Sequence, residues 1–170
     1  MHFHRPCSLP KSKWLPTRAE RAVRNRREKK KLVDKGRSHG ILVYANEEPV
    51  GWCQYGLKEE LPRIDNSSNY RKLAPEDSAE KLWLITCFVV DKKHRKRGVA
   101  STALQVALEA IEKKSGGVVE AYPIASWQSR AFGNESTHGT VSMFQNAGFK
   151  VVATLSKTVF STHVLMRRTI

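Results

Sequence analysis

Positive charge gathers immediately before Gly98, near the middle of the chain. Gly98 allows a backbone to approach a ligand closely, because no Cβ stands in the way. An expected helix begins after it, and the amides of a first helical turn lack acceptors inside the helix and attract anions. Ser101 and Thr102 add hydroxyl donors in that turn. The residues that we expect to bind an anionic ligand are Arg95, Lys96, Arg97, Gly98, Val99, Ala100, Ser101 and Thr102.

Two other signatures for phosphate ligands are missing from this stretch. It contains neither the glycine-rich lysine signature of a P-loop nor G-x-G-x-x-G. We therefore do not expect a nucleoside triphosphate or a dinucleotide held in either of those ways.

The segments on both sides of Gly98 must position the anion site. Residues 82–90 form an apolar, β-branched and aromatic run bounded by charge, which predicts a buried strand. Apolar residues then recur on one face of an expected helix over residues 99–114, and Gly116 suits the position just beyond its end. The pattern predicts a strand, a tight basic turn and a helix that packs on a sheet.

The segment Arg95-Lys96-Arg97-Gly98-Val99-Ala100 fits R/Q-x-x-G-x-G/A and resembles the acetyl-CoA pyrophosphate loop of the GNAT N-acetyltransferase superfamily. Residues 143–149, which end in Gly148-Phe149, resemble the last helix of that family. The resemblance covers about residues 40–168. It implies an α/β (α+β) fold, with a mixed, mostly antiparallel twisted sheet flanked by helices and an acetyl-CoA slot between two splayed central strands. The alternative is a basic surface turn that joins a core strand to a core helix.

The resemblance also implies the reaction. It implies an acetyl-CoA-dependent N-acetyltransferase in which an amine attacks the thioester directly, with no acyl-enzyme and no metal. In the family, backbone near Cys87, Phe88 and Val89 binds the pantetheine arm and the acetyl oxygen, and an oxyanion prefers such fixed donors. No motif identifies the acceptor amine.

The proton-transfer residues depart from the family pattern. Phe144 stands where many relatives carry a tyrosine that protonates the leaving thiol. Glu120, on a strand beside the slot, is either a general base or an exposed strand carboxylate. We take Glu120, Ser142 and Tyr122 as catalytic candidates. The substitutes for the missing tyrosine are Ser142, Thr140, His138, Tyr122 and solvent.

The cysteines point to a reducing compartment. The chain has no C-x-x-C pair among Cys7, Cys53 and Cys87, so we expect neither a disulfide framework nor a zinc site. His2 and His4 lie near Cys7 in the sequence, but we interpret them as residues of a mobile terminus that bind no metal. Cys53 and Cys87 lie in apolar strands without an evident histidine partner, which disfavours a covalent acyl-cysteine. No apolar run reaches the ~20 residues that cross a bilayer. We expect a cytoplasmic protein without a membrane partner.

Charge is unevenly distributed along the 170 residues. The net charge is +14, and residues 1–37 alone hold 13 Lys/Arg against 3 Asp/Glu. A capping-box pattern at Thr17-Arg18-Ala19-Glu20 predicts a basic helix over residues 17–36 after an irregular segment, residues 1–16. Such a helix either binds nucleic acid or an acidic partner, or is a solvated face, and the second interpretation is favoured because no nucleic-acid motif accompanies it.

We expect a single domain over residues 17–170, with a catalytic core at residues 40–168. Residues 40–45 and 49–55 predict a β-hairpin, and residues 56–80 a long connection whose Glu59, Glu60, Arg63, Asp65 and Tyr70 are candidates to line a substrate pocket. Residues 118–121 predict a strand, 139–147 the last helix, and 150–154 and 158–168 a closing antiparallel pair.

The family's first strand has no counterpart before residue 17. This departure keeps two alternatives open: a CoA-binding module with weak catalysis that acts through its basic helix, and a homo-oligomer that borrows an edge strand.

Overall fold

A computed structural model describes residues 18–61, 81–124, 137–157 and 162–170 of the chain. The expected irregular segment 1–16, the Thr17 cap and the pocket candidates Arg63, Asp65 and Tyr70 lie outside these described residues, as does most of the expected loop between residues 124 and 138.

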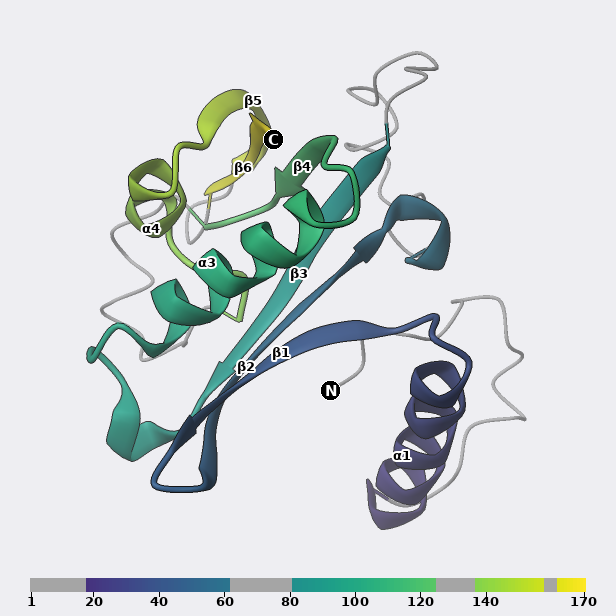
Figure 1. Ribbon diagram of the computed structural model, residues 1–170. Coiled ribbons are helices and arrows are strands. Elements are labelled where there is room, and N and C mark those ends of the chain that lie inside the picture. Colours follow the sequence, from purple (N-terminus) through teal and green to yellow (C-terminus); the bar gives the residue numbers. More distant parts are fainter. Residues whose placement is uncertain (1–17, 62–80, 125–136, 158–161) are drawn as a thin grey trace.

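The core of the fold is a six-stranded sheet in the order β1-β2-β3-β4-β6-β5. Only the β3–β4 pair is parallel, so the sheet is mixed and mostly antiparallel, as predicted. Figure 1 shows α3 crossing one face of the sheet and linking β3 to β4. The strands are β1 (His39–Ala45), β2 (Glu48–Leu57), β3 (Leu82–Val90), β4 (Val118–Ala121), β5 (Lys150–Lys157) and β6 (Thr162–Thr169). The helices are α1 (Arg18–Asp34), α3 (Val99–Glu112) and α4 (Val141–Asn146).

The hairpin of β1 and β2 forms where the sequence predicts it. Ala45 pairs with Glu48, and the two residues between them, Asn46 and Glu47, both have positive φ (49° and 68°). Positive φ at both central positions is typical of the type I′ turn, whose twist matches that of paired strands. β2 continues to Leu57, beyond the expected end at residue 55, because Leu57 still pairs with Trp83 of β3.

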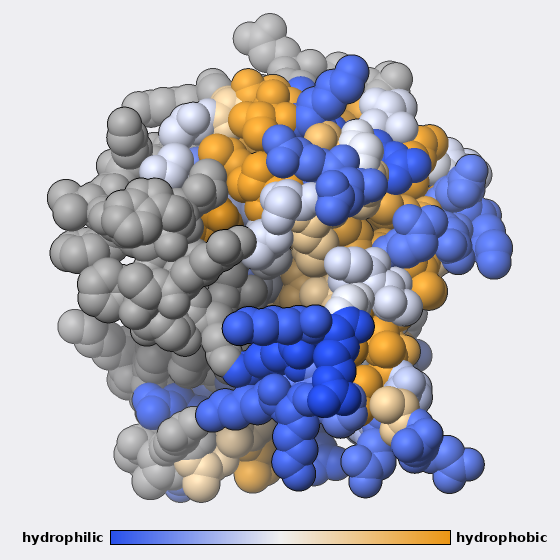
Figure 2. Space-filling model, turned by 90° about the vertical axis from the view of Figure 1, so that its left-hand side faces the viewer, coloured by the Kyte–Doolittle hydropathy of each residue, from blue (hydrophilic) through white to orange (hydrophobic). Residues whose placement is uncertain are grey.

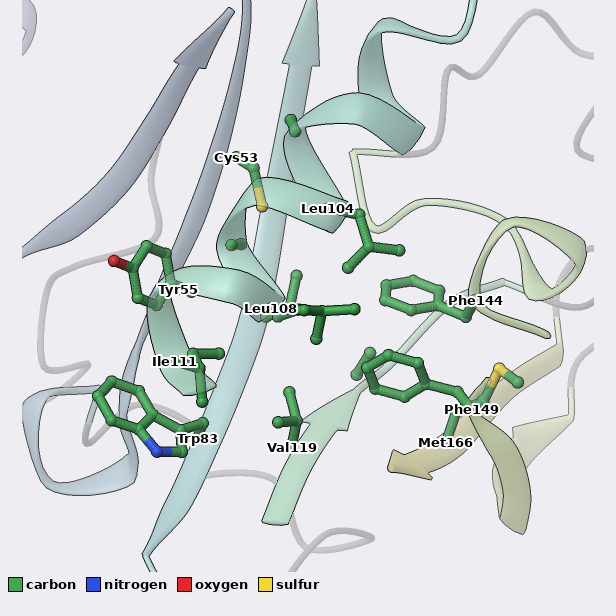
Figure 3. Close-up of a cluster of buried hydrophobic side chains, with 14 of the residues drawn as sticks. Cys53, Tyr55, Trp83, Leu104, Leu108, Ile111, Val119, Phe144, Phe149 and Met166 are labelled. Carbon is green, nitrogen blue, oxygen red and sulfur yellow. The ribbon is translucent and has the colours of Figure 1, made fainter. Parts of the chain in front are cut away.

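The main hydrophobic core lies between the sheet and α3. Figure 3 shows Leu104, Leu108 and Ile111 of α3 directed toward side chains from the strands and from α4. Gly51 of β2 faces the start of α3, where a Cβ would overlap Val99. This close approach fixes the first turn of α3 over the sheet. α3 ends at Glu112, slightly before the predicted residue 114, and Gly116 follows with φ of 59°.

The opposite face of the sheet carries α1. Trp52 alternates along β2 with Gly51 and Cys53, which face α3, so its ring lies on the other face, and Lys29 of α1 stands over that ring, 5.4 Å from its centroid. The apolar content of α1 is thin, and Val23 and Val33 are exposed. Among the described residues, Lys29 contributes a cation–π contact with Trp52 and a hydrogen bond to the Ser38 hydroxyl, which tie this helix to the sheet.

The last helix is shorter than the sequence predicts. α4 begins at Val141 rather than at residue 139, because Gly139 has a left-handed φ of 76° that a helix does not accept. The Thr140 hydroxyl instead caps the helix by accepting from the Met143 N–H (3.2 Å). β5 is longer than expected and reaches Lys157, while β6 begins at Thr162.

Candidate functional site

The turn between β3 and α3 is built to present amides and cations together. Asp91 closes it by accepting from the Lys93 N–H (2.9 Å), and this hydrogen bond lowers the pKa of the Asp91 carboxyl. Lys96 has φ of 59° and Gly98 has φ of 80°, so the chain turns sharply into α3. The first helical bond is from Thr102 N–H to the Gly98 carbonyl (2.9 Å), which leaves the amides just before it without an acceptor inside the helix.

Positive charge surrounds these amides. Lys96 and Arg97 are exposed, and half-buried Arg95 is anchored by a hydrogen bond from Nε to the Val90 carbonyl (3.2 Å). Figure 2 views the molecule from the side on which α3 begins and shows strongly hydrophilic side chains in one dense group. The arrangement is suited to a ligand with several negative charges.

A groove of about 450 Å³ runs from this helix start toward α4. Ser101 and Thr102 line it at one side, and Met143, Asn146 and Ala147 line it from α4, together with residues farther along α3. Its size suits an organic ligand. The predicted anion-binding residues Ser101 and Thr102 thus belong to both the charged turn and the groove.

β3 separates from β4 partway along its length. Their ladder ends at Ile85 and Ala121, while β3 continues to Val90. On its other side, Gln54 of β2 pairs with Cys87 and Tyr55 pairs with Ile85, so Thr86 is an extra residue that forms a β-bulge. A bulge bends and twists its strand. The predicted slot between two splayed central strands therefore opens at Thr86.

The described residues Thr137 to Thr140 approach both sides of this opening. The Phe88 N–H donates to the Thr137 carbonyl (2.6 Å), and Ile124 bridges Thr140 on the other side. Of the expected backbone donors near Cys87, Phe88 and Val89, the Phe88 amide is thus already paired with an acceptor of the protein. The half-buried His138 imidazole follows Thr137 directly.

Glu120 is a buried network carboxylate and not an exposed one. Its side chain is 0 % exposed, one oxygen accepts from the Tyr122 hydroxyl (2.6 Å), and the other accepts from Arg167 Nε (2.7 Å). The expected alternative of an exposed strand carboxylate is wrong, because Leu84, Tyr122 and Leu165 cover this face of β4. Both carboxylate oxygens are occupied, which favours a positioning role over that of a free base.

Two of the three catalytic candidates, Glu120 and Tyr122, are hydrogen-bonded to each other, and Ser142 lies apart from them. Side chains alternate between the two faces of β4. Val119 and Ala121 belong to the core under α3, so Glu120 and Tyr122 lie on the opposite face. Ser142 is exposed on α4, where its hydroxyl lies 3.2 Å from that of Thr140. Phe144 is fully buried against Phe88 and Phe149. Its position is therefore part of the core.

Two imidazoles lie near the opening on the Glu120 side of the sheet. His163 of β6 faces that side, because its neighbour Val164 belongs to the core under α3. The His138 and His163 rings meet edge to face with centroids 6.1 Å apart. Burial, and then the charge of His163, lower the pKa of His138, so its imidazole is neutral near pH 7 and able to accept a proton.

The two described cysteines are not nucleophiles. Cys53 and Cys87 are buried and form no disulfide. Burial raises the pKa of both thiols, which disfavours the reactive thiolate. Among the described residues no group of three or more His, Cys, Asp or Glu side chains is arranged to hold a metal ion. No helix in the described part of the chain is long and apolar enough to span a bilayer.

Several site residues are not apparent from the sequence. Arg167 and His163 reach the site only through the β4–β6 pairing, and Asn146 and Gln105 only through the packing of α4 beside α3. No sequence pattern identifies Thr86, because the position of a β-bulge depends on the register of three strands.

Known structures share this fold, and two of the three described below are named as N-acetyltransferases. A ribosomal-protein-alanine N-acetyltransferase from Brucella melitensis superposes with a TM-score of 0.59 at 13% identity over 87% of this chain and 78% of that one. An N-acetyltransferase from Staphylococcus aureus Mu50 gives 0.55 at 16% identity over 91% and 79%. The NatC complex bound to a Gag peptide and CoA gives 0.53 at 9% identity over 77% and 70%.

Sequence comparison agrees with the fold. No curated protein gives a significant match. The profile of the acetyltransferase (GNAT) family matches residues 6–138, which include the β3 strand, the basic turn and α3. The match covers well over half of the chain, and the chain therefore belongs to the acetyltransferase (GNAT) family.

Proposed function

We propose that this acetyltransferase takes its acetyl group from acetyl-CoA and transfers it to an amine by direct attack. The observation that carries the proposal is the charged turn of residues 95–102, which opens into the groove between α3 and α4 through Ser101 and Thr102. CoA is bound in the related NatC structure, which supports the same ligand here. The pyrophosphate would lie on the first amides of α3, where the helix dipole favours negative charge.

The pantetheine arm would follow the groove to the opening at Thr86. Backbone of Cys87, Phe88 and Val89 is the expected contact for the arm and for the acetyl oxygen. The Thr137 oxygen on the Phe88 N–H occupies such an acceptor position in the structure. The acetyl carbon would then face the side of the sheet that carries Glu120, Tyr122, His138 and His163.

The acceptor amine would approach on that side. The amine nitrogen attacks the thioester carbon, the C–S bond breaks, and CoA leaves as a thiolate that water protonates. Among our three catalytic candidates, Glu120 holds the Tyr122 hydroxyl in place, and Ser142 lies on α4. The neutral His138 imidazole is better placed than these to take the proton that the nitrogen loses.

We also propose a cytoplasmic location, supported by the two buried free thiols Cys53 and Cys87, and a homo-oligomer, supported by apolar exposure on the sheet. The alternative of a weakly catalytic module that acts through its basic helix has less support. Part of the charge of α1 is used internally: Arg24 pairs with Glu28 (2.8 Å), and Lys29 stands over Trp52.

Calorimetric titration with acetyl-CoA, beside desulfo-CoA and ATP, tests the function. We expect saturable one-to-one binding of acetyl-CoA, stronger than that of ATP. Gly98→Glu should abolish it, since a carboxylate would stand where the phosphates bind. Gly36→Glu is the matched control, because Gly36 also has a left-handed φ and open space around an added Cβ. A folded protein that does not bind acetyl-CoA would leave the interaction module as the better interpretation.

A further inference from the structure

Thr86 occupies the point at which the sheet opens. It is the first residue of β3 beyond the ladder with β4, which ends at Ile85. It is also the bulged residue toward β2, because Gln54 pairs with Cys87 and Tyr55 with Ile85. Thr86 therefore has no cross-strand partner on either side.

The Thr86 hydroxyl has no hydrogen-bond partner among the residues that the structure describes. Its Oγ1 is shielded from solvent and makes no hydrogen bond within the described protein. A buried hydroxyl without a partner is costly, and folded proteins rarely keep one unless something else uses it. The nearby Phe88 N–H, by contrast, is engaged by the Thr137 carbonyl. The Thr86 hydroxyl is thus an unused side-chain donor at the opening.

We propose that the Thr86 hydroxyl donates a hydrogen bond to the thioester carbonyl oxygen of bound acetyl-CoA and to the oxyanion that forms from it. The proposal rests on acetyl-CoA as the donor substrate. When the amine nitrogen bonds to the carbonyl carbon, an electron pair moves onto the oxygen that Thr86 faces. When the C–S bond breaks, the pair returns and the thiolate leaves. Thr86 keeps its proton throughout, so it stabilises charge without acting as an acid.

The stabilisation of the oxyanion would come from a hydrogen-bond donor that is fixed in position and shielded from water. A hydrogen bond to a developing oxyanion is worth most where water is excluded and the donor need not reorient. Thr86 is held by a β-bulge, a feature that often re-aims a side chain beside an active site. Acetyl-CoA would then satisfy a hydroxyl that is otherwise unpaired.

Thr86→Val tests the role, because valine keeps the shape and removes the hydroxyl. With acetyl-CoA and a mixture of short peptides bearing free N-terminal amines, we expect CoA release about 100-fold slower than in the wild type. The thermal midpoint should be equal or higher, since an unsatisfied polar group is gone. Thr86→Ser should retain most of the activity. Thr154→Val on exposed β5 is the matched control and should behave as the wild type.

Infrared spectroscopy of bound acetyl-CoA labelled with ¹³C at the carbonyl gives a readout that needs no acceptor. The carbonyl band should lie at a higher wavenumber in Thr86→Val than in the wild type. Equal bands, or a Thr86→Ser protein as slow as Thr86→Val, would overturn the Thr86 assignment and leave the acetyltransferase proposal intact. A folded wild-type protein that binds no acetyl-CoA would remove the basis of both.

Discussion

Burial decides what each titratable residue of this protein can do. Glu120 is fully buried and its two oxygens are already occupied, whereas the half-buried His138 is held neutral. The sequence identified residues 95–102 as candidates because a local pattern suffices there, whereas it offered Tyr122 only as one of several substitutes for the missing tyrosine. It could not decide between Glu120 and His138 as the proton acceptor, since their partners Arg167 and His163 come from β6, far along the chain.

A pH profile tests His138 as the proton acceptor. The base must be neutral, and its pKa lies below the usual 6.5, so CoA release should persist under mildly acidic conditions and fall only as the pH drops through the lowered pKa. His138→Gln should reduce turnover at neutral pH by about 100-fold, at the lower end of the range for general bases.

The neighbouring imidazole supplies the second arm of that experiment. His163→Phe keeps the edge-to-face ring contact but removes a positive charge that lowers the His138 pKa. The acid limb should therefore move to higher pH, while turnover on the plateau stays close to that of the wild type. His39→Gln is the control for the loss of an imidazole elsewhere in the protein. His39 lies on β1, where its Nε2 is 3.3 Å from the Glu60 carboxylate. An acid limb that is the same in all variants would contradict the assignment.

At the scale of elements, periodicity predicts the strands and helices well and their junctions less well. β3 has the bounds that its apolar run predicts, and α3 has the predicted start. The β-bulge at Thr86 and the Gly139 turn escape prediction because they depend on strand register and on packing against Phe88 and Phe144. The opening between β3 and β4, where we propose that the thioester lies, begins at the bulge.

The pairing of β4 with β6 depends on a buried ion pair. Glu120 lies opposite Arg167 in the register, and removing the carboxylate leaves the guanidinium without its charge partner. Glu120→Gln should lower the free energy of unfolding by about 3 kcal/mol, the lower end of the range for a broken buried pair, since Arg167 is partly exposed. Chemical denaturation measures this change.

Glu109→Gln is the matched control for that substitution. Glu109 is exposed on α3, where its carboxylate accepts from Gln105 Nε2 (3.2 Å), so its loss should change stability by no more than about 0.5 kcal/mol. An equal effect of the two substitutions would mean that the Glu120–Arg167 pair contributes nothing to the strand pairing.

At the scale of the whole molecule, the two edges of the sheet differ in what they leave exposed. β1 forms one edge and exposes Leu42 (53 %) and Tyr44 (57 %) on the face opposite α3, and Val89 of the central strand β3 is 39 % exposed on the same face. An exposed apolar patch that continues inward from an edge strand is typical of an interface. β5, at the other edge, exposes the adjacent pair Val151 and Val152 (49 % each).

The proposed homo-oligomer should therefore depend on the β1 edge. Light scattering of the purified protein should give a mass above 19.3 kDa that falls to the monomer value on dilution. Leu42→Ser with Tyr44→Ser should give a monomer at every concentration, because the apolar surface that drives association is lost. Val151→Ser with Val152→Ser removes similar exposure at the opposite edge and should leave the mass unchanged. A wild-type protein that is monomeric at high concentration would contradict the proposed homo-oligomer.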